Sequence, residues 1–431
     1  MFYENQPIAN RDNYKKMLSI IGNLTLLFSE SDCPYLPYRA HENIFCRYLQ
    51  AENLARKDCS ADAKKDKIGI GLKTWVGKDD QKVAEFGLLR ETFAGLTGMD
   101  LVRKIAEYRN ERIRVTMNLH GIDTMIYHIV KRVPGTMQIL EHTFDYIDID
   151  NLSIIEDRGN VNNTYFSDGH HIYHFSSSKN TLYMIFEDME LLDSFEVEIM
   201  DDPYSFLMHL MYGDEPVDLD PSLVEATIST EQPKLPQLCL RLYSSRADGR
   251  KFVAEQSGLN QWNGIRTSNY KRADGTWVHR ESKRDENELY IPYLVDDRMR
   301  DPDFFPPRDT DFRLRLPDGQ VISAKVCQAA HKKMPDSQYQ LLSAAEKEIE
   351  DRRRNEGKSI MSNPNNALGE WLLRTVFELP VGTVVTYEML QKFGVDSVVF
   401  TKHGEFDYSV DFSEIGTYEA FYGEENQEEQ Q

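Results

Sequence analysis

The feature that most constrains the fold is a break near the middle of the chain. Residues 213–237 are rich in proline and acidic residues and follow neither a helical nor a strand period, which is typical of a linker. The chain has 431 residues, more than one domain usually contains. We therefore predict an N-terminal domain at 1–212, a linker at 213–237, a C-terminal domain at 238–413 and an acidic tail at 414–431.

The two halves differ in their apolar patterns. The N-terminal half combines helical spacing at residues 12–28, 39–55 and 99–118 with a strand pair within 60–75 and β-rich runs between 136 and 187. The C-terminal half has short strand patterns at 238–245, 287–294, 311–326, 381–387 and 396–412, with helices at about 337–355 and 367–377. We predict an α+β protein in which an α/β core precedes a β-barrel.

Composition restricts the classes of function. The chain contains no apolar run of roughly 18 residues and no apolar leader, so we expect a cytoplasmic protein without a membrane segment. Its five cysteines are far apart and form no CxxC pair, which predicts neither disulfides nor a cysteine zinc site. The formal net charge of −21 argues against nucleic-acid binding. Basic residues nevertheless cluster near 103–114, 266–272 and 352–354, and such local clusters permit DNA binding.

The stretch SADAKKDKIGIGLKTW, Ser60 to Trp75, has the residue types of a metal-dependent nuclease site. Asp62 precedes a turn and Lys73 lies in the strand that follows. Strand alternation places Gly71 and Lys73 on the side opposite Ile70 and Leu72. Phosphodiester hydrolysis requires carboxylates that hold Mg²⁺ and a lysine near the phosphate. An exposed Asp–Lys pair without a function is the alternative interpretation.

A second carboxylate is required from another element. Glu42, in a polar patch at the start of the helix at 39–55, is our preferred candidate, and Glu85 is the second. The order of Glu42, Asp62 and Lys73 resembles that of the PD-(D/E)XK nuclease superfamily. The departures are Ala61, where that family has proline, and Gly71, where it has an acid. The resemblance implies a restriction-endonuclease-like core with Mg²⁺ held by Asp62 and Glu42, and the departures permit an inactive fold.

The most informative stretch of the C-terminal half is SGLNQWNGIRTSNYKRADGTWVHRESKRDENELYIPYL, in which amides and bases alternate with aromatic residues. Such planar donors suit the reading of base edges. A second polar cluster, GKSIMSNPNNALGEW, precedes a helix. The predicted DNA contacts are Asn260, Gln261, Trp262, Asn263, Arg266, Lys271, Arg272, Lys358, Ser362, Asn363, Asn365 and Asn366.

The order of these C-terminal motifs, over residues 235–412, resembles the DNA-binding domain of NgoFVII-type restriction endonucleases. That resemblance implies a B3-like pseudobarrel whose two arms, here the loop around 260–272 and the segment around 358–366, hold duplex DNA. With the N-terminal motif it predicts a sequence-specific, Mg²⁺-dependent restriction endonuclease that works alongside a cognate DNA methyltransferase. Cutting both strands requires a homodimer or sequential nicking.

Two alternatives remain open. A modification-dependent endonuclease would use Trp262, Tyr270 or Trp277 around a flipped base. A DNA-binding protein with a degenerate nuclease fold would agree with Gly71. HHIYH at 170–174 is a weak zinc candidate, because a further ligand is not apparent.

Overall fold

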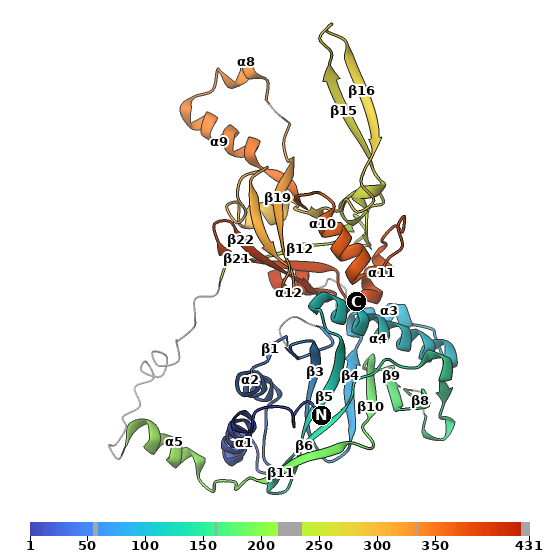
Figure 1. Cartoon of the computed structure of the whole chain (residues 1–431), viewed down its shortest axis with the longest axis vertical. Coiled ribbons are helices and arrows are strands. Elements are labelled where there is room, and N and C mark those ends of the chain that lie inside the picture. The colour runs from blue at the N-terminus through green and yellow to red at the C-terminus, as the bar shows by residue number, and fades with distance from the viewer. Residues whose placement is uncertain (55–58, 160–161, 214–234, 333, 424–431) are drawn as a thin grey trace. The chain divides into compact units, whose positions relative to one another are not determined.

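The computed structural model describes residues 1–54, 59–159, 162–213, 235–332 and 334–423 (Figure 1). The chain divides into two compact units, Met1–Met117 with Gly121–Lys234, and Asn118–His120 with Leu235–Gln431. Most of the expected linker, residues 214–234, lies outside the described residues. Within the described part, no helix is long and apolar enough to cross a membrane.

The first unit is built on a mixed six-stranded sheet in the order β1-β2-β3-β5-β6-β11. Strand β3 is parallel to β5, and the other neighbours are antiparallel. The long helix α4, Gly98–His120, connects the two halves of the sheet and ends where Gly121 adopts a left-handed conformation. The strands are β1 (Glu52–Asn53), β2 (Ala63–Lys65), β3 (Ile68–Val76), β5 (Thr124–Val133), β6 (Thr136–Thr143) and β11 (Glu190–Glu196).

Helices α1, Ile8–Asn23, and α2, Tyr38–Leu49, pack on one face of this sheet. Helix α2 follows Pro37 and ends at Gln50, which adopts a left-handed conformation. The apolar side chains of β3 form the core under these helices, since Ile70 and Leu72 belong to the same buried cluster as Phe45. The predicted alternation of β3 therefore has its apolar side against the helices.

A second, antiparallel sheet of the first unit has the order β4-β10-β9-β8-β7. Its strands are β4 (Asp80–Glu85), β10 (Thr181–Ile185), β9 (Ile172–Ser176), β8 (Asn163–Ser167) and β7 (Ser153–Ile154). Shorter helical elements are η1 (Thr25–Leu27), η2 (Gly87–Leu89), α3 (Arg90–Phe93), η3 (Ile149–Asn151), η4 (Glu156–Arg158) and α5 (Pro203–Tyr212).

The second unit contains a seven-stranded sheet in the order β12-β21-β22-β18-β19-β20-β17. Its edge strands β12 and β17 approach each other, so the sheet is nearly closed into a barrel. The strands are β12 (Gln237–Arg241), β17 (Ile291–Pro292), β18 (Asp311–Arg315), β19 (Val321–Ala329), β20 (Gly357–Ser362), β21 (Ser397–Gly404) and β22 (Asp407–Ser413). The α+β class is thus confirmed, whereas a nuclease-like N-terminal core stays a prediction.

A two-stranded hairpin projects from this barrel-like sheet (Figure 1). It consists of β15, Ile265–Lys271, and β16, Trp277–Lys283, and it follows the short helix η5, Gly258–Asn263. A smaller strand pair is β13 (Ser244–Ser245) with β14 (Lys251–Phe252), and the helices are α7 (Val295–Arg300), α8 (Asp336–Tyr339), α9 (Ala344–Asn355), α10 (Ala367–Gly369), η6 (Glu370–Val376), α11 (Tyr387–Phe393) and α12 (Thr417–Tyr422).

Several expected elements differ from those observed. Residues 381–387 form no strand, because Thr386 caps helix α11 with its side chain. The expected loop at 260–272 is η5 followed by a full strand, β15, which pairs with β16. The strand was not predicted because its sequence is mostly polar and lacks an apolar alternation. The expected helix at 337–355 is two helices, since Ser343 begins a new one with a capping box. Part of the expected tail forms α12, in which Tyr418 is buried.

Candidate active site and candidate nucleic-acid interface

Asp62 directly precedes β2, and Lys73 lies in the adjacent strand β3. The backbone N–H of Asp62 donates to the carbonyl oxygen of Ile70 at 2.9 Å, and its carboxylate accepts from the backbone N–H of Leu72 at 2.7 Å. Burial raises the pKa of Asp62, and the charge of Lys73 opposes that rise. Burial lowers the pKa of Lys73, and Asp62 opposes that fall. The two groups therefore share one poorly solvated environment.

Glu42 reaches the same site from helix α2. Its side chain is buried, and one carboxylate oxygen accepts from Arg39 Nη1 at 2.9 Å. Burial raises the pKa of Glu42, the Arg39 hydrogen bond opposes this, and the negative charge of Asp62 raises the pKa further. The three residues that the order along the chain singled out thus lie close enough for their charges to affect one another's pKa values.

Glu85, the second candidate for the missing acid, is placed differently. It ends strand β4 of the other sheet, its side chain is exposed, and its carboxylate forms an ion pair with Lys82 Nζ at 2.6 Å. A carboxylate that is exposed and already paired is a weaker candidate than Glu42 for a site built around Asp62.

Strand β3 has no room for an acidic side chain at the position of Gly71. A Cβ atom at Gly71 would lie 2.8 Å from Tyr127 Cδ1 and 3.0 Å from Phe144 Cε1. These two rings stack at a centroid distance of 4.1 Å and an interplanar angle of 7°. The space that an acidic side chain at position 71 would need is therefore filled by an aromatic pair.

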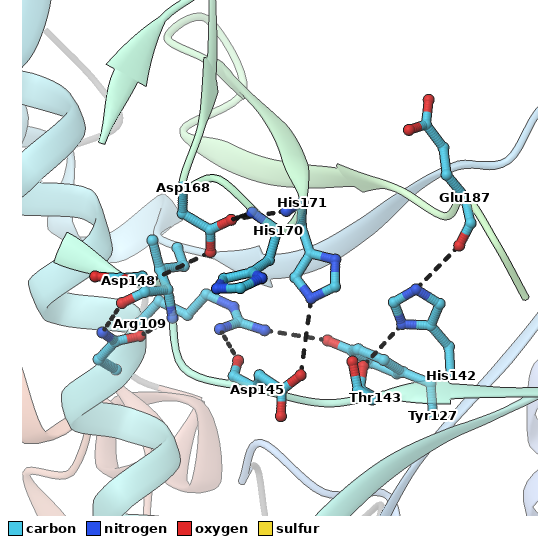
Figure 2. A network of polar contacts seen from close by, with 12 residues as sticks. Arg109, Tyr127, His142, Thr143, Asp145, Asp148, Asp168, His170, His171 and Glu187 are labelled. Carbon is cyan, nitrogen blue, oxygen red and sulfur yellow. Dashed lines mark hydrogen bonds and ion pairs between the residues drawn. The ribbon is translucent and has the colours of Figure 1, made fainter. Parts of the chain in front are cut away.

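A buried arginine lies beside Tyr127 of this pair (Figure 2), and its Cζ atom is 5.4 Å from the centroid of the Phe144 ring. Arg109 of α4 donates to the carbonyl oxygen of Asp145 at 2.8 Å and to the Tyr127 hydroxyl at 3.4 Å. Its positive charge lowers the pKa of Lys73, although burial of Lys73 is the larger cause. The sequence placed Arg109 in a basic cluster, but its hydrogen bond to Tyr127 depends on the return of β5 beside β3.

Histidines extend the same network, as Figure 2 shows. His171 Nε2 lies 3.8 Å from an oxygen of Asp145, and its backbone N–H donates to the buried carboxylate of Asp168 at 2.7 Å. His174 points elsewhere and stacks between Tyr165 and Tyr183. Within the described ranges, no group of three or more His, Cys, Asp or Glu residues could hold a metal ion.

The pair Glu42 and Asp62 is nevertheless suited to Mg²⁺. Magnesium is commonly held by one or two carboxylates, while water and substrate phosphate oxygens complete its coordination. The pKa values of both carboxyls are raised, chiefly by burial. A bound cation would relieve the cost of ionising them. The donor set therefore fits the ion that the resemblance implies.

Three predicted DNA contacts of the second unit are buried. The Asn260 amide donates to the carbonyl oxygens of Ala254 at 3.0 Å and Val385 at 2.9 Å, and it accepts from the Val385 N–H at 2.8 Å. Ser362 is also buried, and its hydroxyl accepts from the backbone N–H of Leu368 at 2.9 Å. These two side chains hold loops in place and do not face solvent. Gln261 is buried as well.

The remaining predicted contacts have mixed exposure. Asn263, Arg266, Arg272, Lys358 and Asn363 are exposed, whereas Trp262, Asn365 and Asn366 are partly buried. Asn263 donates to the Glu255 carbonyl oxygen at 3.0 Å, and Asn363 lies 3.1 Å from an Asp311 oxygen. The side chain of Lys271 lies outside the described residues. The exposed set on the hairpin is the part able to meet a ligand.

The hairpin is a basic projection on an acidic chain. Residues 265–284 contain six basic and two acidic residues, whereas the whole chain has a formal net charge of −21. Trp277 and Ile265 are each 62% exposed. A nearly closed sheet with a basic two-stranded arm defines a domain of the class that binds nucleic acid.

The comparison with family models agrees with this class. Residues 249–404 match the NgoFVII C-terminal B3-like DNA-binding domain, a domain of a restriction enzyme. The match supports DNA as a partner and confirms the expected resemblance for the second unit. No curated protein is similar to the chain.

Proposed function

We propose that the protein is a Mg²⁺-dependent restriction endonuclease. The observation that carries the proposal is the joint environment of Glu42, Asp62 and Lys73, in which the charges of these residues shift one another's pKa values. The restriction-enzyme DNA-binding domain in the same chain supports it. Joining the two units raises the local concentration of the cutting site at bound DNA.

In this proposal each residue of the site has a separate role. Glu42 and Asp62 would hold Mg²⁺, and a bound ion would supply charge neutralisation at the scissile phosphate. Lys73 donates to a phosphate oxygen or orients the attacking water. The Leu72 N–H and Arg39 orient the two carboxylates. A methyltransferase that protects the same sequence would be the partner in the cell.

Plasmid cleavage tests the proposal. Wild type with Mg²⁺ should give discrete fragments, whereas wild type with EDTA and the Asp62→Ala variant should give none. Methylated and unmethylated plasmids in parallel separate a modification-dependent enzyme from an ordinary one. Failure of wild type to cut either plasmid would overturn the endonuclease function.

A second candidate function is DNA binding by an inactive nuclease fold. The Tyr127–Phe144 pair beside Gly71 favours it, because the acid that the family carries at that strand position has no space. In that case the wild type and Asp62→Ala would bind DNA equally, and neither would cleave it.

A further inference from the structure

The foot of the β15–β16 hairpin contains a buried carboxylate. Glu288 has no exposed surface. One of its oxygens lies 3.1 Å from Arg266 Nη2. The other oxygen accepts from Arg284 and from the Tyr290 hydroxyl, which lies 2.5 Å away. One side chain thus binds two guanidinium groups and a phenol.

These two arginines come from the two different sides of the hairpin and lie at the same end of it, its foot. Arg266 is near the start of β15, and Arg284 directly follows β16. The two strands pair along their full length, from Ile265 opposite Lys283 to Lys271 opposite Trp277. An isolated two-stranded ribbon is only marginally stable, so its direction depends on how its ends are held. Glu288 holds both strands at once, where they leave the barrel.

The contacts also assign a role to Arg266. Its guanidinium is bound to a fully buried carboxylate, although its side chain remains 49% exposed. A charge buried in this way is costly to leave unpaired. Arg266 therefore helps to hold the foot of the hairpin, and its predicted role in reading bases stays a prediction.

We propose that Glu288 is a positioning residue for DNA binding, which fixes the direction of the basic hairpin before the duplex arrives. This inference rests on the proposed DNA-binding function. A hairpin that is already oriented loses less conformational freedom when it binds. The exposed residues of the arm, including Arg280 and Trp277, would then meet DNA as one rigid element.

The test compares Glu288→Gln with Glu286→Gln in the full chain. Glu286 is exposed and two residues away, so both variants lose one negative charge. Simple electrostatics predicts that both bind DNA slightly more tightly. The positioning role predicts that Glu288→Gln alone binds a fluorescent duplex about tenfold more weakly in EDTA, a change of about 1.4 kcal/mol.

Hydrogen exchange in the free protein is the second readout. Amides of β15 and β16 should exchange about tenfold faster in Glu288→Gln, while those of the barrel strands keep their wild-type rates. Arg266→Gln is a milder variant, since Arg284 still pairs with Glu288. It should accelerate the same amides, whereas Lys283→Gln, which removes an exposed charge at the same foot, should not.

Each outcome decides one question. Equal binding by the two glutamate variants, or unchanged exchange in the hairpin of both Glu288→Gln and Arg266→Gln, overturns the positioning role. Absence of DNA binding by the wild type overturns the proposed function, while the exchange data still report whether Glu288 anchors the arm. If the amides of all barrel strands exchanged faster in Glu288→Gln and Arg266→Gln, the role of Glu288 would be purely structural. That result would also overturn the positioning role.

Discussion

Placing an acid at position 71 should damage the protein and leave cleavage no faster. An added Cβ would lie 2.8 and 2.9 Å from two atoms of the Tyr127 ring and 3.0 Å from Phe144. Both rings are buried and stacked, so neither can move without disturbing its neighbours. Overpacking of this kind costs about 1–3 kcal/mol. We therefore expect Gly71→Ala to lower stability by that amount, and Gly71→Asp to lower it more because its charge is also buried.

The measurement is thermal unfolding of the full chain. A loss of 1–3 kcal/mol corresponds to a fall of about 2–12 °C in Tm for a unit of this size. Gly87→Ala is the matched control, because the same methyl group would meet no atom within 4 Å there. Plasmid cleavage by Gly71→Asp should not exceed that of the wild type. A Gly71→Ala protein as stable as Gly87→Ala, or faster cleavage by Gly71→Asp, would refute the reasoning.

Three further outcomes follow from buried polar groups. If cleavage requires ionised Glu42, the cleavage rate should rise with pH through the raised pKa of that carboxyl. Arg39→Gln removes the positive charge that opposes the rise in pKa, so it should shift the acid limb of the pH–rate profile to higher pH. An unshifted limb would contradict this. Asn260→Ala should lower the free energy of unfolding, measured in urea, by about 3 kcal/mol or more, because three hydrogen bonds are lost in the core. The DNA affinity of the folded fraction should change little. Burial raises the pKa of Asp396 from 3.8 to about 6. The folded state therefore binds the proton more tightly than the unfolded state, and about 3 kcal/mol of stability should be lost as pH rises from 4 to 6. Asp396→Asn should remove that dependence. An unchanged slope of stability against pH in this variant would contradict the raised pKa of Asp396.

Local patterns were sufficient for much of the architecture. The helices and strands that carry Glu42, Asp62 and Lys73 follow from apolar spacing and from the residues that end each element, because both depend on neighbours a few positions apart. Their order along the chain predicted a shared site, and the fold places all three in one poorly solvated environment. Their role in catalysis stays a prediction. The motif order of the C-terminal half predicted the domain that residues 249–404 match.

Contacts between distant segments determined the rest. Gly71 could be read as a missing acid, but only the return of β5 beside β3 shows Tyr127 and Phe144 in its place. Asn260 and Arg266 have the chemistry of base-reading side chains, yet one is hydrogen-bonded in the core to Val385 and the other is bound to Glu288. Residue type states which hydrogen bonds a side chain can make. Burial, which depends on elements that pack from far along the chain, decides whether those bonds remain available for a ligand.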